Sequence, residues 1–236
     1  MVGIIDFGLK DYKETLDLQT QLFQTLVDEK KEGKEGNEYI LIGEHPPVIT
    51  LGRRAKESNI LVNETSLLSK GIKTYHIGRG GDVTYHCPGQ MIVYPILDLE
   101  RHNLGVKDYV NLLEESIIRL LENYGLKSGR VEGASGVWVG KGTKEERKIC
   151  AIGIKCSRFC TMHGLALNVS SDLSGFSMIN PCGFQDKGVT SLQREFEFIN
   201  MGNAKEIPNI SEVKKRFLGI FLGLVFPLEE VLHFAE

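Results

Sequence analysis

Residues 136–157 read "GVWVGKGTKEERKICAIGIKCS", and this stretch determines the predicted fold class. Two apolar runs, at 136–140 and 148–157, flank a polar segment that contains a glycine and several charges. Two strand-like runs joined by a short polar turn are typical of a β-hairpin. The segment "MHGLALNV" at 162–169 predicts another strand further along the chain. The strand pairing is therefore expected to be largely antiparallel.

The rest of the chain predicts helices around this sheet. Apolar residues recur at helical spacing in three segments, at 11–31, at 106–125 and from Ser211 onward. Asn63 is placed to cap a short helix that ends at Gly71. Further short strands are expected at 39–45, 48–52, 72–77 and 91–99. These patterns predict an α+β fold, with a mixed, largely antiparallel sheet flanked by helices, in a single domain spanning residues 1–236.

Composition and charge argue against several functional classes. The 236 residues are 42% hydrophobic and 25% charged, which is typical of a globular protein. The formal net charge of -3 gives no overall basic footprint for nucleic acid. The N-terminus reaches acidic residues too early for a secretory signal, and the apolar run at 217–226 is too short to span a bilayer. We therefore predict a soluble, cytoplasmic protein that binds neither nucleic acid nor membrane.

A second informative stretch is "RGGDVTYHCPG", from Arg79 to Gly89. It places three glycines and a proline within eleven residues, and a segment so rich in these residues is usually a loop. Glycines also allow a backbone to approach a ligand closely. We therefore interpret the stretch as a loop that could hold a substrate.

The cysteines supply a candidate nucleophile. Five cysteines occur in the chain, and the odd number without a CxxC pair argues against a disulfide framework or a structural zinc site. Cys182 lies between Pro181 and Gly183, in a setting that favours a loop, where a thiol is accessible. On local sequence alone, an inert turn cysteine is the favoured interpretation and a nucleophile is the alternative. Cys87 lies beside His86, but adjacent side chains on an extended chain point apart.

A nucleophilic thiol needs a basic or cationic partner, and the sequence leaves its identity open. His86 and His163 lie in the motif-like segments "TYHCPGQ" and "TMHGLALN", although histidines in such segments are often structural. Lys148 and Lys155 are seven positions apart and would point to opposite faces of an unbroken strand. The spacing does not indicate which lysine faces the candidate site.

Six segments of the chain, taken together, resemble a known family. They are "HPPVITLG", "RGGDVTYHCPGQ", "GVWV", "KICAIGIK", "HGLALNV" and "NPCGF…VTSL". They occur in the order found in the lipoyl(octanoyl) transferases, and the resemblance covers residues 45–192. One departure is Cys87, where the family usually has glycine. If that position required a positive φ, Cys87 would be strained.

The resemblance implies a fold, a reaction and two catalytic residues. The fold resembles the catalytic domain of biotin and lipoate protein ligases. The reaction moves an octanoyl group from octanoyl-acyl carrier protein to a lysine of a lipoyl domain, in lipoate biosynthesis. The acceptors of the family are the lipoyl domains of 2-oxoacid dehydrogenases and the glycine cleavage H protein. Cys182 would carry the acyl group as a thioester and Lys148 would be its partner, with no cofactor or metal. We expect a monomer, but no sequence feature determines the oligomeric state.

The resemblance also implies substrate-binding positions. They are Arg79, Gly80, Gly81, Asp82, Val83, Thr84, Tyr85, His86, Ala151, Ile152, Gly153, Gly164, Leu165 and Ala166. The glycine-rich loop would then surround the acyl group and its thioester. Each buried methylene would contribute about 0.8 kcal/mol of binding free energy.

Two other functions are compatible with the fold. An ATP-dependent lipoate–protein ligase needs a lysine but no nucleophilic cysteine, so the Pro-Cys-Gly sequence at 181–183 argues against it. A non-catalytic relative would bind the acyl carrier or the lipoyl domain, but here every expected catalytic position is filled.

Overall fold

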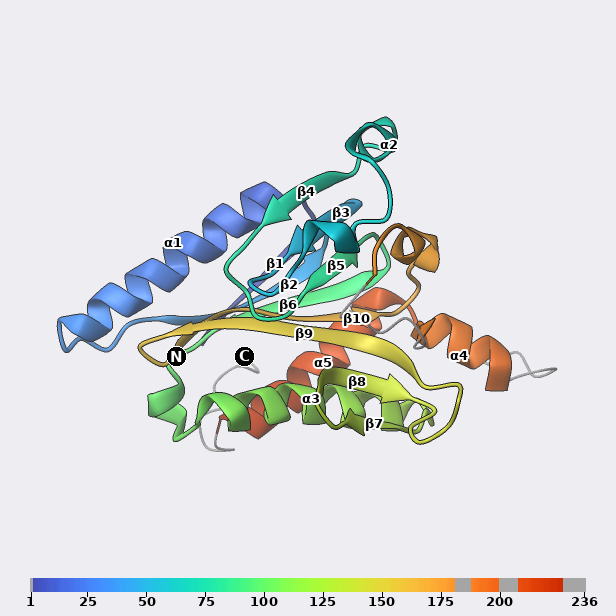
Figure 1. Ribbon diagram of the computed structural model, residues 1–236. Helices are drawn as coiled ribbons and strands as arrows, with labels where there is room; N and C mark the ends of the chain where they lie inside the picture. Colours follow the sequence, from blue (N-terminus) through green and yellow to red (C-terminus); the bar gives the residue numbers. More distant parts are fainter. Residues whose placement is uncertain (1, 181–187, 200–207, 227–236) are drawn as a thin grey trace.

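The computed structural model describes residues 2–180, 188–199 and 208–226 and contains a large and a small β-sheet (Figure 1). The order in the large sheet is β1–β2–β6–β10–β9–β8–β7, and β11 pairs with β9 beside this path. The β1/β2 and β9/β11 pairs are parallel and the others are antiparallel. The strands of this sheet are β1 (Val2–Leu9), β2 (Glu38–Glu44), β6 (Gln90–Ile96), β7 (Ser128–Val131), β8 (Ala134–Val139), β9 (Arg147–Ser157), β10 (Cys160–Asn168) and β11 (Gly188–Val189).

The small sheet has the order β4–β3–β5. Its strands are β3 (Val48–Leu51), β4 (Lys73–His76) and β5 (Val83–His86). Strand β3 pairs parallel with β4 and antiparallel with β5. The segment between β4 and β5 contacts both sheets, because the Gly80 amide donates to the Ile154 carbonyl of β9 and Arg79 donates to the Thr50 carbonyl of β3.

Helices cover both faces of the large sheet (Figure 1). The long ones are α1 (Tyr12–Lys31), α3 (Val106–Asn123) and α5 (Ile210–Val225). The shorter ones are α2 (Glu64–Ser69), α4 (Leu192–Ile199) and the 3₁₀ segments η1 (Glu57–Asn59), η2 (Leu99–His102) and η3 (Leu173–Met178). An Asp or Asn side chain caps several of the helices by accepting a backbone N–H of the first turn, as Asp11 does for α1, Asn63 for α2 and Asn209 for α5.

The two faces of the sheet carry separate apolar cores. Helices α3 and α5 pack Leu113 and Phe217 against Val93 and other residues of one face. Helix α1 packs Phe23 and Leu26 on the opposite face. Residues two apart on a strand share a face, so a single strand such as β6 contributes alternate side chains to both cores. The candidate site draws residues from both faces: Ile152 and Leu165 pack with the core under α3 and α5, and Ala166 packs with the core under α1.

Most of the predicted elements are confirmed. The three long helices, the short helix capped by Asn63 and the β8–β9 hairpin all form. Strands β1, β7 and β11 and helix α4 were not predicted, and residues 83–86, predicted as loop, form strand β5. Within the described ranges, no helix is both long and apolar enough to cross a membrane.

Candidate active site

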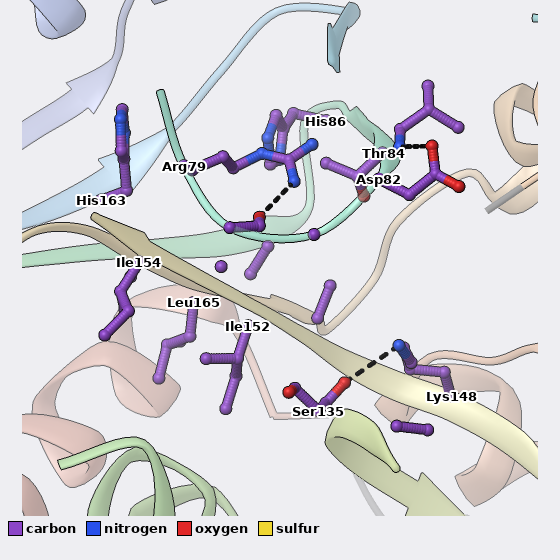
Figure 2. A pocket seen from close by; sticks show the side chains of 18 of the residues that line it. Arg79, Asp82, Thr84, His86, Ser135, Lys148, Ile152, Ile154, His163 and Leu165 are labelled. Carbon is purple, nitrogen blue, oxygen red and sulfur yellow. Dashed lines mark hydrogen bonds between the residues drawn. The ribbon is translucent and has the colours of Figure 1, made fainter. Parts of the chain in front are cut away.

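A cavity of about 480 Å³ lies beside the glycine-rich segment, residues 79–89, and next to strands β9 and β10 (Figure 2). This volume falls in the usual range for small-molecule sites. Fourteen positions that the sequence analysis assigned to the site line it: Arg79, Gly80, Gly81, Asp82, Val83, Thr84, His86, Lys148, Ala151, Ile152, Gly153, Gly164, Leu165 and Ala166. The structure thus brings together segments that are widely separated in sequence.

Two predicted site residues are not among those that line the cavity. Tyr85 packs with a third apolar cluster, where its ring meets Phe176 edge to face. It alternates along β5 with Thr84 and His86, which face the cavity. Cys182 lies outside the residues that the structure describes.

Arg79 braces the glycine-rich segment from within. Its buried guanidinium donates from Nη2 to the carbonyl of Thr50 at 2.7 Å and from Nη1 to the carbonyl of Gly80 at 3.0 Å (Figure 2). A buried guanidinium is costly unless acceptors surround it. These bonds therefore tie the segment to strand β3 of the small sheet.

The segment also approaches β9 closely. The Gly80 amide donates to the Ile154 carbonyl at 2.7 Å, and Gly81 has a φ of 88°. A Cβ built on Gly153 would lie 2.8 Å from the Gly80 carbonyl oxygen, closer than real Cβ contacts come. Glycine at 153 therefore permits the segment to rest on the strand.

We expect Gly153→Ala to displace the glycine-rich segment and to lower the rate of acyl transfer about tenfold. The added methyl must move a backbone carbonyl, and overpacking of this kind costs about 1–3 kcal/mol. The measurement is the transfer rate together with the urea unfolding midpoint. Gly78→Ala is the matched control, because its Cβ would meet only the flexible Lys155 side chain at 3.4 Å. Equal rates for the two variants would contradict the prediction.

Lys148 lies at the other end of the cavity. Its Nζ donates to the Ser135 carbonyl at 3.0 Å and lies 4.7 Å from the centroid of the Trp138 ring (Figure 2). Trp138 is the cross-strand neighbour of Lys148 on β8. A cation over an indole ring is electrostatically favourable, so these two groups hold the ammonium at the cavity wall.

The two candidate lysines share one face of the sheet, which corrects the prediction from spacing. Lys155 lies over the ring of Phe23, on the α1 face, and Lys148 lies over Trp138, on the same face. The β8–β9 register shifts between Val137, opposite Cys150, and Trp138, opposite Lys148. One extra residue on β9 at this β-bulge reverses the alternation, so an odd spacing no longer separates the faces.

An ion pair anchors the chain beside Lys148. Arg147 Nε donates to Glu195 Oε1 at 2.6 Å and Nη2 donates to Oε2, in a two-pronged contact with a carboxylate that is 2% exposed. Thr190 adds its hydroxyl to the same carboxylate and donates its amide to the Lys148 carbonyl at 3.0 Å. Strand β11 and helix α4 are thereby fixed against β9.

We expect Arg147→Ala to lower the free energy of unfolding by about 3 kcal/mol, because it leaves the buried Glu195 carboxylate without its main partner. The measurement is denaturant unfolding at neutral pH. Arg119→Ala is the control, since its pair with Glu115 on the surface of α3 is half exposed and is worth less than about 1 kcal/mol. Similar losses in both variants would show that the Arg147–Glu195 pair contributes little.

A chain of polar side chains fixes the tautomer of His86. Its Nδ1 lies 2.7 Å from Gln90 Oε1, Gln90 Nε2 donates to Asn168 Oδ1 at 2.8 Å, and Asn168 Nδ2 donates to the Thr190 carbonyl at 2.9 Å. An amide oxygen accepts only, so Nδ1 carries the proton and Nε2 is the acceptor. Burial lowers the pKa of His86 to about 3, which keeps the ring neutral.

His163 lies deep in the cavity (Figure 2). Its φ is 60°, an unusual conformation for a residue other than glycine, and its amide donates to Gln19 Oε1 at 3.1 Å. Burial, reinforced by the charges of Arg79 and Lys155, lowers the pKa of His163 to about 3. Both candidate histidines are therefore neutral groups that can accept or donate hydrogen bonds.

Of the four described cysteines, Cys87, Cys150 and Cys160 are buried and Cys156 is half-buried. Burial raises the pKa of Cys87 and of Cys160 to about 11, and it also raises the pKa of Cys150 and Cys156. Cys87 packs in the apolar cluster behind β5, away from the ring of His86, and its φ is not positive. The strain considered for Cys87 is therefore absent.

The cavity includes further residues that the sequence did not single out. They are Tyr12, Arg54, Gln90, Tyr94, Val110, Ala134, Ser135, Trp138, Ile154, Asn168, Phe176, Gly188 and Val189, with Gly133 in the turn between β7 and β8. Trp138 and Asn168 lie inside the quoted motifs, but Tyr12 and Val110 lie on helices whose pattern indicates packing alone. In the described part of the chain, no three His, Cys, Asp or Glu side chains could together hold a metal ion.

Comparison with known proteins identifies relatives over most of the chain. The family described as Lipoyl protein ligase A/B catalytic domain matches residues 11–221. An octanoyltransferase of Parabacteroides distasonis is 53% identical over 191 residues, which cover 80% of this chain and 86% of that protein. An octanoyltransferase of Bacteroides thetaiotaomicron is 50% identical over 213 residues, which cover 90% of both.

Solved structures show the same fold at low identity. One chain belongs to a structure described as a bi-partite lipoate protein ligase and its E2 lipoyl domain from Thermoplasma acidophilum. It is 13% identical, with a TM-score of 0.62 over 94% of this chain and 82% of that chain. Biotin protein ligase from Aquifex aeolicus, in complex with biotin and ATP, is 14% identical, with a TM-score of 0.51 over 94% and 70%. The predicted ligase-like fold is confirmed.

Proposed function

The chain belongs to the Lipoyl protein ligase A/B catalytic domain family and is an octanoyl-transferring enzyme of protein lipoylation, and we propose that it works through a thioester on Cys182. The octanoyl donor is octanoyl-acyl carrier protein and the acceptor is a lysine of a lipoyl domain. One observation carries the proposal. Val189, which ends the strand following residues 181–187, lines the cavity and pairs with Lys148.

This pairing supports an encounter between Cys182 and Lys148. Strand β11 pairs parallel with β9, Gly188 opposite Arg147 and Val189 opposite Lys148. At the other end of the segment, the Asn180 amide donates to the Asn59 carbonyl at 2.7 Å. The chain on both sides of Cys182 is thus attached to the body of the protein, and on one side directly beside the lysine.

The cavity provides an apolar surface for an acyl chain. Ile152, Ile154 and Leu165 extend from β9 and β10 toward helices α3 and α5, on the side of the strands away from Arg79 (Figure 2). Val110 of α3 also lines the cavity. Each methylene of the octanoyl chain buried there contributes about 0.8 kcal/mol of binding free energy. The polar groups that also line the cavity, including Arg79 and Lys148, can orient the thioester.

The first half-reaction forms the acyl-enzyme. The Cys182 thiolate attacks the thioester carbonyl of the donor, and the neighbouring Lys148 ammonium favours the thiolate by opposite charge. The bond between the carbonyl carbon and the carrier sulfur breaks. The carrier thiolate leaves and takes a proton from Lys148, which becomes neutral.

The second half-reaction returns the enzyme to its starting state. The neutral amine of the acceptor lysine attacks the acyl-enzyme carbonyl and forms an amide. Its surplus proton passes to the neutral Lys148, and Cys182 leaves as a thiolate. A thioester intermediate allows the two protein substrates to bind in turn, because the acyl group stays on the enzyme between them.

The other cysteines support this assignment by contrast. A nucleophilic cysteine needs a lowered pKa and access to the substrate. All four described cysteines have pKa values raised by burial. None of the four is among the residues that line the cavity.

The test is acylation in two separate steps. The enzyme is incubated with octanoyl-acyl carrier protein, and intact mass with peptide mapping is expected to show one octanoyl group on Cys182. Addition of a lipoyl domain without ATP is then expected to remove the group and to modify one lysine of the domain. A requirement for ATP would identify a ligase instead. Tight binding without covalent mass would indicate a non-catalytic relative.

A further inference from the structure

Arg54 lies at the mouth of the cavity, in the turn between β3 and η1. Its side chain is exposed to solvent and also lines the cavity, so it lies where the cavity opens. The turn has a defined position, because the Arg54 amide donates to the Gly81 carbonyl at 3.1 Å and the Arg53 amide donates to the Arg79 carbonyl at 3.0 Å. The guanidinium is thus attached to the glycine-rich segment through its own backbone.

The other charged side chains that line the cavity form hydrogen bonds with protein atoms. Arg79 donates to Thr50, and Lys148 donates to the Ser135 carbonyl. Asp82, the acidic side chain of the wall, accepts the Val83 amide at one oxygen and the Asn59 amide group at the other.

Arg54 differs from these groups. Over residues 2–180, 188–199 and 208–226, its side chain makes no hydrogen bond or ion pair. It therefore presents its donors to whatever passes through the opening.

We propose that Arg54 binds the phosphate of the arm that carries the acyl group of the donor. This inference rests on the proposed function and names the part of the donor that the mouth recognises. An acyl carrier holds its acyl group as a thioester on a phosphopantetheine arm, which is linked to the protein through a phosphodiester. The cavity wall is also exposed beside Lys148, at Ser135 and Gly188. In our proposal the thioester lies at Lys148 and the arm runs back along the glycine-rich segment, so that its phosphate leaves the cavity at Arg54.

The chemistry of the side chain fits this ligand. A guanidinium binds phosphate with two parallel N–H···O bonds, and such charge-assisted bonds are among the strong hydrogen bonds of proteins. Arg53 and Lys56 belong to the same turn and are also exposed, but neither lines the cavity. Of the three cations, only Arg54 is placed to meet an arm that threads the opening.

The experiment compares two small donors that differ by the phosphate. Octanoyl-pantetheine and octanoyl-phosphopantetheine are each used to acylate the enzyme, and kcat/KM for acylation is measured for both. The wild-type enzyme is expected to prefer the phosphorylated donor about tenfold, as a charge-assisted contact implies. Arg54→Gln is expected to bring this ratio close to one. Arg53→Gln, the matched control in the same turn, is expected to retain the wild-type ratio.

The outcomes separate this inference from the proposed function. Acylation of the wild-type enzyme by both donors at equal rates would overturn the phosphate site while leaving the thioester mechanism intact. The phosphate site would also be overturned if Arg54→Gln kept the wild-type preference for the phosphorylated donor, or if Arg53→Gln lost that preference to the same extent. An enzyme that neither donor nor octanoyl-acyl carrier protein acylates would contradict the proposed function, and the inference would fall with it.

Discussion

Cys182→Ala is expected to abolish the octanoyl adduct and to lower octanoyl transfer by about 10⁴-fold or more. Without the thiolate, the acyl group has no attachment point on the enzyme, and loss of a nucleophile in comparable enzymes removes most of the rate enhancement. Folding is expected to be retained. The measurement is intact mass after incubation with octanoyl-acyl carrier protein, followed by the rate of lipoyl-domain modification.

Cys87→Gly is the matched control. Cys87 is 2% exposed, and its side chain packs in the apolar cluster behind β5, where burial raises the pKa of its thiol to about 11. The variant loses that packing and gains backbone freedom, so its stability is expected to fall by about 1 kcal/mol or more. Substantial acyl transfer is expected to remain. If Cys182→Ala still formed the octanoyl adduct and Cys87→Gly did not, the nucleophile would be Cys87 instead of Cys182.

Local patterns predicted the three long helices well because each has a sharp sequence signature. In α3, Tyr109, Leu113 and Leu120 recur at helical spacing and are all fully buried. Gly125, with a φ of 75°, follows the end of this helix, as expected for a residue that stops one. The β8–β9 hairpin had an equally clear signature of two apolar runs and a polar turn.

Strand β1 was missed because its sequence lacks such a signature. Gly3 and Gly8 interrupt the strand, and Ile4 is 42% exposed, so the alternation of buried and exposed residues does not follow hydrophobicity. Strand β1 pairs parallel with β2, and the connection between the two strands contains the whole of helix α1. Pairing between segments so far apart depends on tertiary packing, which local propensity does not encode.

Most of the described residues that the sequence assigned to the site line one cavity, but the geometry of that cavity was not predicted. The glycine-rich segment was recognisable from its composition. The hydrogen bonds that hold it were not, because Arg79 donates to Thr50 and Gln90, the partner of His86, donates to Asn168, and both pairs are far apart in the sequence. The face of Lys148 could not be obtained from parity, because a β-bulge inserts one residue beside it. Such a bulge has no marker in the sequence "RKICAI".

Lys148→Ala is expected to slow both half-reactions. Loss of an ammonium beside the thiol disfavours the thiolate, so the pKa of Cys182 should rise and its alkylation by iodoacetamide at pH 7 should fall about tenfold. Transfer to the lipoyl domain should fall further, because the attacking amine also loses its proton acceptor. The measurements are the alkylation rate against pH, with the labelled peptide identified by mass, and single-turnover transfer from the preformed acyl-enzyme.

Lys148→Arg separates the charge from the proton transfer. A guanidinium stays protonated, so this variant should preserve alkylation of Cys182 better than it preserves transfer. Lys155→Ala is a demanding control, because Lys155 lies on the same strand and the same face but contacts Phe23 instead of lining the cavity. It should affect neither measurement strongly. The prediction would be contradicted if the pKa of Cys182 were unchanged in Lys148→Ala. It would also be contradicted if that pKa rose only in Lys155→Ala, because Lys155 does not line the cavity.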